Sequence, residues 1–102
     1  MGTTMTAKWQ DLVKFGDDRP NPQTMIENDR VRVIIAGLKP GQRIPIHPEA
    51  AAVYHFLEGQ GVMTVDNAQL PVQPGTVIVV DEGAQRGLLA ETQLVFMAVR
   101  LA

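Results

Sequence analysis

The sequence lacks the residues on which several kinds of chemistry depend. Its 102 residues include no cysteine, no serine and only two histidines, His47 and His55. The absence of cysteine excludes a disulfide framework and thiolate metal sites. Ser-His-Asp and Cys-His mechanisms are excluded as well, because neither nucleophile is available.

An excess of one charge and long hydrophobic runs are also missing. The net charge is −2, with both signs mixed along the chain, so no basic surface for nucleic acid or membranes is expected. No apolar run approaches the roughly 18 residues of a membrane-spanning helix. The N-terminal residues lack the apolar core of a signal peptide. We therefore expect a soluble, cytoplasmic protein.

What is present is a regular series of short β-prone runs. The apolar fraction of 45% is enough for the core of one domain. From Gln23 onward, apolar runs alternate with turn residues about every ten residues, a pattern typical of an all-β sandwich or barrel of short antiparallel strands. We predict an N-terminal arm of residues 1–23 and a β-barrel domain of residues 24–102. The expected strands are residues 24–27, 30–38, 43–47, 51–57, 62–65, 69–72, 76–80, 84–90 and 93–101.

The N-terminal arm allows two interpretations. Its apolar residues Trp9, Leu12, Val13 and Phe15 have spacings that fit one or two turns of helix. Alternatively, the arm lays Trp9 and Phe15 on the barrel or on a partner subunit.

Two features of the strands indicate how they are placed. Pro45 and Pro71 each remove a backbone donor, so their strands should lie at sheet edges or bends. Residues 53–57, 77–80 and 94–99 are apolar on both faces, whereas a strand of a small antiparallel barrel normally exposes one face to water. We expect the N-terminal arm or a second subunit to cover the outer face, and we predict a homodimer.

The turn residues also resemble a known pattern. The segments Leu57-Glu58-Gly59-Gln60-Gly61 and Pro74-Gly75-Thr76, with Pro40-Gly41 before them and Gly83 after, resemble the two motifs of the cupin superfamily over roughly residues 30–101. The resemblance implies a double-stranded β-helix, or jelly-roll barrel, with a cavity between its sheets.

In metal-bearing cupins the first motif supplies a His-x-His pair and a glutamate, and the second supplies a third histidine. Such a donor set suits divalent transition metals. Counting from Gly59, the glutamate position falls on Ala52, the second histidine on His47 and the first on Pro45. Counting from Gly41 instead, His47 matches the first histidine.

In the second motif the histidine position falls on Arg86, and arginine cannot ligate a metal. We therefore expect no cofactor. If a metal is present, it should be a divalent transition metal bound through His47, with Glu49 as the best replacement carboxylate.

We predict a ligand-binding site formed by His47, Glu49, Tyr54, Phe56 and Arg86. Strand alternation places Ala52, Tyr54 and Phe56 on one face and His55 on the other. If Arg86 points into the cavity, it needs a negative partner, either Glu49 or an anionic ligand. Otherwise Arg86 is solvent-exposed or pairs with Asp81 or Glu82.

Three functions follow from these residues. The first is a binding or sensing module for a small anionic or aromatic molecule, without a metal. The second is an enzyme: a metal-dependent oxygenase, isomerase or decarboxylase rebuilt around His47 and Glu49, or a metal-free isomerase using His47 or Tyr54 as acid or base. The third is a structural dimerisation domain whose barrel is filled by side chains such as Phe96 and Met63.

Overall fold

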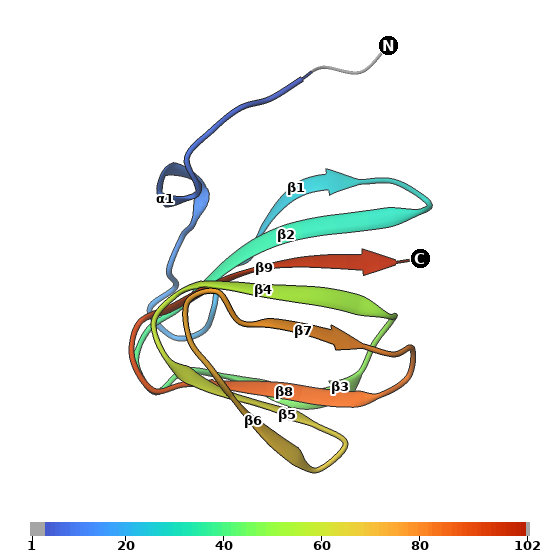
Figure 1. Ribbon diagram of the computed structural model, residues 1–102. Helices are drawn as coiled ribbons and strands as arrows, with labels where there is room; N and C mark the ends of the chain where they lie inside the picture. Colours follow the sequence, from blue (N-terminus) through green and yellow to red (C-terminus); the bar gives the residue numbers. More distant parts are fainter. Residues whose placement is uncertain (1–3, 102) are drawn as a thin grey trace.

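The strands begin and end close to the turn residues of the sequence. The computed structural model describes residues 4–101, in which one short helix, α1 (Trp9–Leu12), is followed by nine strands (Figure 1). The strands are β1 (Gln23–Glu27), β2 (Val31–Leu38), β3 (Arg43–Pro48), β4 (Ala52–Glu58), β5 (Gly61–Val65), β6 (Ala68–Val72), β7 (Val77–Val80), β8 (Gln85–Ala90) and β9 (Leu94–Leu101).

Several turns use residues that tolerate a positive φ. Asp66 and Asn67, with φ of 46° and 73°, connect β5 to β6 in a two-residue hairpin. Two positive φ values in succession fit the right-handed twist of the flanking strands. Gly59 has φ of 83° directly after β4, where it lets the chain return as β5.

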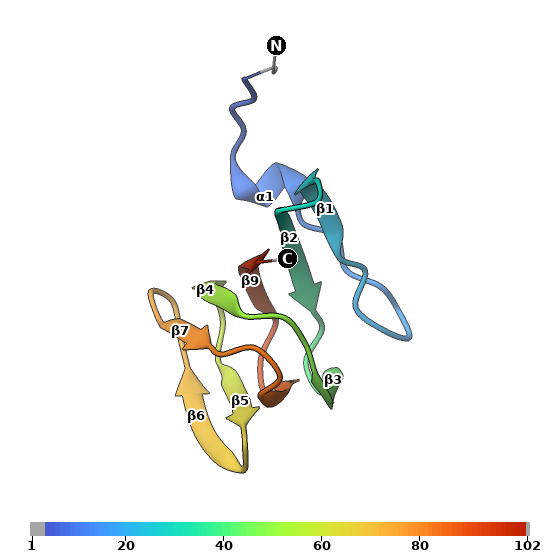
Figure 2. The ribbon, with the colours of Figure 1, turned by 90° about the vertical axis from the view of Figure 1, so that its right-hand side faces the viewer.

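The strands form two antiparallel sheets that face each other. The five-stranded sheet has the order β1-β2-β9-β4-β7, and the four-stranded sheet has the order β3-β8-β5-β6. Figure 2 shows β2, β9 and β4 side by side, with β1 at the margin beside α1. Pro45 in β3 and Pro71 in β6 lie on the two edge strands of the smaller sheet, as predicted.

The core lies between the sheets. Side chains from the inner faces of β2 to β9 fill it, and three aromatic rings form its centre: Phe96 lies 5.8 Å from Tyr54 and 5.7 Å from Phe56, measured between ring centroids. Ala52, Tyr54 and Phe56 are buried while Val53 and His55 are exposed, which confirms the predicted alternation of β4. The buried cluster comprises Ile34, Ala36, Leu38, Ala52, Tyr54, Phe56, Met63, Val72, Val80, Leu88, Ala90, Leu94, Phe96 and Ala98.

The N-terminal segment shows the predicted helical turn and, of the alternative, the packing of Phe15 on the barrel, while Trp9 lies in the helical turn. It contains one helical turn, and beyond it Val13 and Phe15 pack against Gly37 on β2. A Cβ atom at Gly37 would lie 2.5 Å from a ring carbon of Phe15, so glycine is required for this close contact. Within residues 4–101, no helix has both the length and the apolar composition that crossing a membrane requires.

Candidate ligand-binding cavity

One end of the space between the sheets is not filled by side chains. A cavity of about 450 Å³ lies there, within the range of small-molecule sites. The third hypothesis expected side chains to fill the barrel. At this end the barrel is hollow instead, and Tyr54, Met63 and Phe96 line the cavity. The remaining wall comes from Arg19, Pro20, Pro22, Ile34, Arg43, Ile44, Pro45, His47, Glu49, Arg86, Gly87, Leu88, Ala98 and Arg100.

Strand β3 and the residues after it bring His47 and Glu49 to the cavity. The register of β3 on β8 shifts between Ile44 and His47, and His47 then pairs with Arg86 across the two strands. The Nδ1 atom of His47 lies 2.8 Å from the carbonyl oxygen of Pro45. Since that oxygen can only accept, Nδ1 carries the proton, and in the neutral ring Nε2 is left as an acceptor.

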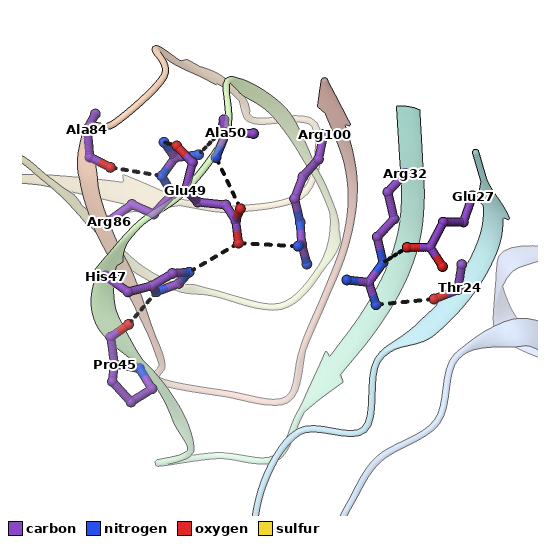
Figure 3. Close-up of polar contacts among 10 residues, drawn as sticks. All are labelled: Thr24, Glu27, Arg32, Pro45, His47, Glu49, Ala50, Ala84, Arg86 and Arg100. Carbon is purple, nitrogen blue, oxygen red and sulfur yellow. Dashed lines mark hydrogen bonds and ion pairs between the residues drawn. The ribbon is translucent and has the colours of Figure 1, made fainter. Parts of the chain in front are cut away.

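Among residues 4–101, Glu49 is the only carboxylate of the cavity wall, and it lies at the centre of the polar contacts there (Figure 3). Its Oε2 atom is 3.2 Å from an Nη atom of Arg100 and 3.9 Å from Nε2 of His47. Its Oε1 atom accepts a 3.1 Å hydrogen bond from the backbone N–H of Ala50.

These contacts favour the charged form of Glu49. The Ala50 N–H, which is the largest influence, lowers the pKa of the Glu49 carboxyl below its ordinary value. Burial opposes this change in pKa, while the positive charges nearby, first that of Arg100, reinforce it. The carboxylate therefore stays ionised at neutral pH and neutralises one of the surrounding cations.

Arg86 is buried, with only 1% of its surface exposed, but its partners differ from those expected. Its guanidinium donates to backbone carbonyl oxygens rather than to a carboxylate. The acceptors, with their distances, are Ala84 (3.1 Å), Ala50 (2.7 Å), Glu49 (3.0 Å) and Asp81 (2.9 Å). Figure 3 shows the guanidinium directed toward the chain around Glu49 and Ala50.

This arrangement corrects the sequence-based account of Arg86. Glu49 and Asp81 are indeed its partners, but through their main-chain oxygens. Five N–H groups belong to a guanidinium, and four hydrogen bonds of this kind leave little capacity for a ligand. Arg86 therefore joins the chain before β4 to the turn between β7 and β8.

Of the other predicted ligand-binding residues, Tyr54 faces the cavity and Phe56 does not. No hydrogen bond is present for the Tyr54 hydroxyl within residues 4–101, so this group is available to a ligand. Phe56 is fully buried behind Phe96 and is not part of the lining.

Three further arginines of the wall were missed from the sequence: Arg19, Arg43 and Arg100. The position of Arg100 could have been predicted, because alternation along residues 93–101 places it on the same face as Phe96 and Ala98. For Arg43 the evidence in the sequence was weaker, namely that it precedes His47 on the same strand. For Arg19 there was none, because it lies in the loop before β1 and reaches the cavity only through the path of that loop.

The side chains present do not fit the metal centre of metal-bearing cupins. Counted from Gly59, proline, alanine and arginine occupy three of the four ligand positions, and on either count the third histidine is replaced by the cation of Arg86. In the described part of the chain, His, Cys, Asp and Glu side chains nowhere form a group of three or more that could hold a metal ion. His47 and Glu49 alone provide two donors beside Arg100, whose charge repels a cation.

Comparisons with known proteins agree with this fold. The family model described as "Cupin domain" matches residues 34–100. No curated protein matches the chain. A solved RmlC-like cupin protein from Desulfovibrio desulfuricans is 23% identical, with a TM-score of 0.87 and coverage of 97% of each chain.

Two other solved structures show how widely the fold is used. An uncharacterised protein with a double-stranded β-helix domain from Klebsiella pneumoniae is 16% identical, with a TM-score of 0.87, covering 97% of this chain and 90% of that one. Salicylate 1,2-dioxygenase from Pseudoaminobacter salicylatoxidans, solved as adducts with gentisate, is 17% identical, with a TM-score of 0.73. That match covers 79% of this chain but 24% of the dioxygenase.

Proposed function

From the premise that this chain belongs to the cupin family, we propose that it reversibly binds a small organic anion in the cavity between its sheets. The anionic group of the ligand is held by the arginines of the wall, and its apolar or aromatic body lies against the inner faces of the sheets. Binding requires neither a metal nor a covalent step, so the protein acts as a binding or sensing module.

The observation that carries this proposal is the charge of the cavity wall. Four arginines line it against one glutamate, in a chain whose net charge is −2. An excess of positive charge inside a concave site of an otherwise acidic protein attracts anions. Because the guanidinium of Arg86 is used by carbonyl groups, the anion is left to Arg100, Arg43 and Arg19.

Arg100 is the residue best placed to hold the anion. Only 25% of its side chain is exposed, and its contact with Glu49 holds it at the cavity. A planar guanidinium offers two parallel N–H groups to a carboxylate, and partial burial strengthens such charge-assisted hydrogen bonds. Glu49 therefore positions Arg100 and uses only part of its donor capacity.

The rest of the cavity suits an apolar or aromatic body. Tyr54 and Phe96 present ring surfaces, and Met63 and Leu88 add flexible apolar area. The Tyr54 hydroxyl can bond a polar substituent of the ligand. The dioxygenase named above acts on salicylate, an aromatic acid, with the same fold, which supports the choice of ligand class although a shared fold does not determine function.

A second function, metal-free acid-base catalysis, is favoured by one observation. The Pro45 carbonyl fixes the His47 tautomer and leaves Nε2 at the cavity beside Glu49. An imidazole held in this way can accept a proton from a bound acid and return it. This activity would be identified by the exchange of a substrate C–H hydrogen with deuterium from the solvent. The exchange should be lost in His47→Gln.

Binding is tested first by thermal unfolding and calorimetric titration with salicylate and benzoate, with neutral benzamide as the matched control. We expect the two carboxylates, but not benzamide, to raise the unfolding temperature, because only they engage the arginines. Salt should weaken the binding through screening.

The arginine variants decide whether this binding uses the cavity. Arg100→Met should weaken benzoate binding about tenfold or more, since a hydrogen bond to a charged group contributes about 1.5–3 kcal/mol. Arg30→Met, which removes an exposed arginine outside the cavity wall, serves as the control. Equal affinity of Arg100→Met and the wild type would reject the proposed site.

A further inference from the structure

Two arginines lie directly opposite each other at the rim of the cavity. The register pairs Arg32 of β2 with Arg100 of β9, and Arg100 with the buried Ala52 of β4, so both arginines are on the inner face of the five-stranded sheet. Side chains opposite each other on neighbouring antiparallel strands start about 5 Å apart, and like charges in such a pair are destabilising. The pair is therefore stabilised by a negative group that both guanidinium groups can share.

Among residues 4–101, the carboxylates that contact this pair stand at its outer ends. The Oε2 atom of Glu27, on β1, lies 3.5 Å from Nε of Arg32, and the Oε2 atom of Glu49 lies 3.2 Å from an Nη atom of Arg100. Figure 3 shows the order Glu49, Arg100, Arg32, Glu27 across the site. Each carboxylate thus holds its arginine from the side that faces away from the other arginine.

Both guanidinium groups have donors that the described part of the chain does not use. A guanidinium has five N–H groups. In residues 4–101, the guanidinium of Arg100 donates one hydrogen bond, to Glu49. That of Arg32 donates one of 3.4 Å, from Nη2 to the hydroxyl oxygen of Thr24, while its buried Nε atom donates none. The Arg32 guanidinium is therefore weakly held and can bond a further acceptor.

On the basis of the anion binding proposed above, we propose that Arg32 and Arg100 together bind the phosphate group of a small phosphate monoester. A carboxylate has two oxygens, which one guanidinium satisfies with two parallel N–H groups. The phosphate of a monoester has three terminal oxygens and a charge of about −1.5 to −2 at pH 7. It can accept from both guanidinium groups at once and offset the repulsion between them.

The position of the pair allows the rest of such a ligand to enter the cavity. Ile34, two residues after Arg32 on the same face of β2, lines the cavity, as do Arg100 and Ala98 on β9. Tyr54 pairs with Ala98 in the same row of the sheet. The Arg32 side chain is 39% exposed and that of Arg100 is 25% exposed, so the phosphate stays partly hydrated at the rim while its apolar or aromatic substituent contacts Tyr54.

The test compares phenyl phosphate with benzoate by calorimetric titration in a phosphate-free buffer. The two ligands share a phenyl ring and differ in the anionic group. We expect the wild type to bind phenyl phosphate about tenfold or more tightly than benzoate. In Arg32→Met, phenyl phosphate should bind about tenfold more weakly and benzoate by about threefold or less, because one guanidinium is enough for a carboxylate. Inorganic phosphate should bind more weakly than phenyl phosphate, since it lacks the ring.

Arg30→Met is the matched control, because it removes an exposed arginine in the turn before β2, outside the cavity wall. It should leave both affinities unchanged, and circular dichroism should show that both variants are folded.

The outcomes separate the phosphate subsite from the function on which it rests. If the wild type binds benzoate, the subsite alone is rejected by equal affinity for the two ligands, by a preference for phenyl phosphate that survives in Arg32→Met, by the same loss in Arg30→Met, or by inorganic phosphate that binds as tightly as phenyl phosphate. If the wild type binds neither phenyl phosphate nor benzoate, the proposed function is rejected together with the subsite.

Discussion

Arg86 shows how one buried cation can hold several segments of the chain together. Counted along the sequence motif, its position corresponds to the third histidine of metal-bearing cupins, and its guanidinium holds four carbonyl oxygens of the surrounding chain. A permanent cation thus reinforces the junction between the chain before β4 and the turn before β8, which the backbone hydrogen bond from Gly83 to Glu49 also holds. The other arginines of the cavity wall are Arg19, Arg43 and Arg100.

This role predicts a loss of stability in Arg86→Met. The substitution removes a donor from four carbonyl groups, of which those of Glu49 and Asp81 keep a backbone N–H and those of Ala50 and Ala84 are left unsatisfied, and each buried unsatisfied group costs about 1–3 kcal/mol. We expect the free energy of unfolding, measured with urea, to fall by roughly 3 kcal/mol or more. Arg43→Met, at an exposed arginine of the same cavity, should change it by about 0.5 kcal/mol or less. A loss below about 1 kcal/mol in Arg86→Met would contradict the structural role.

Glu49 predicts a pH dependence of stability. Its pKa is lowered in the folded chain, so its contribution is fully present above the unfolded-state pKa and is lost as the pH falls through the folded-state value. Glu49→Gln should therefore lose less stability than the wild type when the pH is lowered across the acidic range. Glu82→Gln, at an exposed position, is the control. Parallel pH curves for Glu49→Gln and the wild type would show that the carboxylate contributes nothing.

At the scale of the elements, turn residues explain why the strands were predictable. Each of the nine expected runs corresponds to one strand, because glycine, proline and asparagine mark the turns and apolar alternation marks the faces between them. The helix was ambiguous because its single turn is too short to show periodicity. The position of His55 on the outer face followed from alternation along β4 alone.

The site was less predictable than the strands, for a physical reason. Arg86 bonds residues as many as 37 positions away, and Arg100 meets Glu49 from 51 positions away. Such partners depend on the register between strands and on loop paths, which no local pattern reveals. His47, Glu49 and Tyr54 were found because the family resemblance located them relative to the turns, and Arg100 required the register of β9.

Gly59, between β4 and β5, offers a direct test of one turn. A Cβ atom there would lie 1.8 Å from the carbonyl oxygen of Gln93, whereas at Gly75 no atom lies within 4 Å. Both glycines have positive φ, so alanine at either position costs about 1–2 kcal/mol in backbone strain. Gly59→Ala should destabilise the protein beyond Gly75→Ala, because the backbone must move as well. Equal unfolding midpoints in urea would show that the close approach is absent.

For the whole molecule, the two faces of the larger sheet have different roles. The inner face contributes Tyr54, Phe96 and Arg100 to the cavity, while Val53 and Val79 on the outer face are exposed. Strands β4 and β9 therefore take part in both surfaces. The sequence predicted a dimer from strands that are apolar on both faces, and solution mass is the measurement that decides it.

The central claim is that the cavity binds an organic anion through its arginines, and nuclear magnetic resonance tests it most directly. Benzoate is titrated into ¹⁵N-labelled protein, and the backbone amide shifts are followed. We predict saturable shifts concentrated at the cavity wall, around His47, Tyr54 and Arg100, that are strongly reduced in Arg100→Met. Shifts concentrated elsewhere, or shifts that persist unchanged in the variant, would contradict the claim.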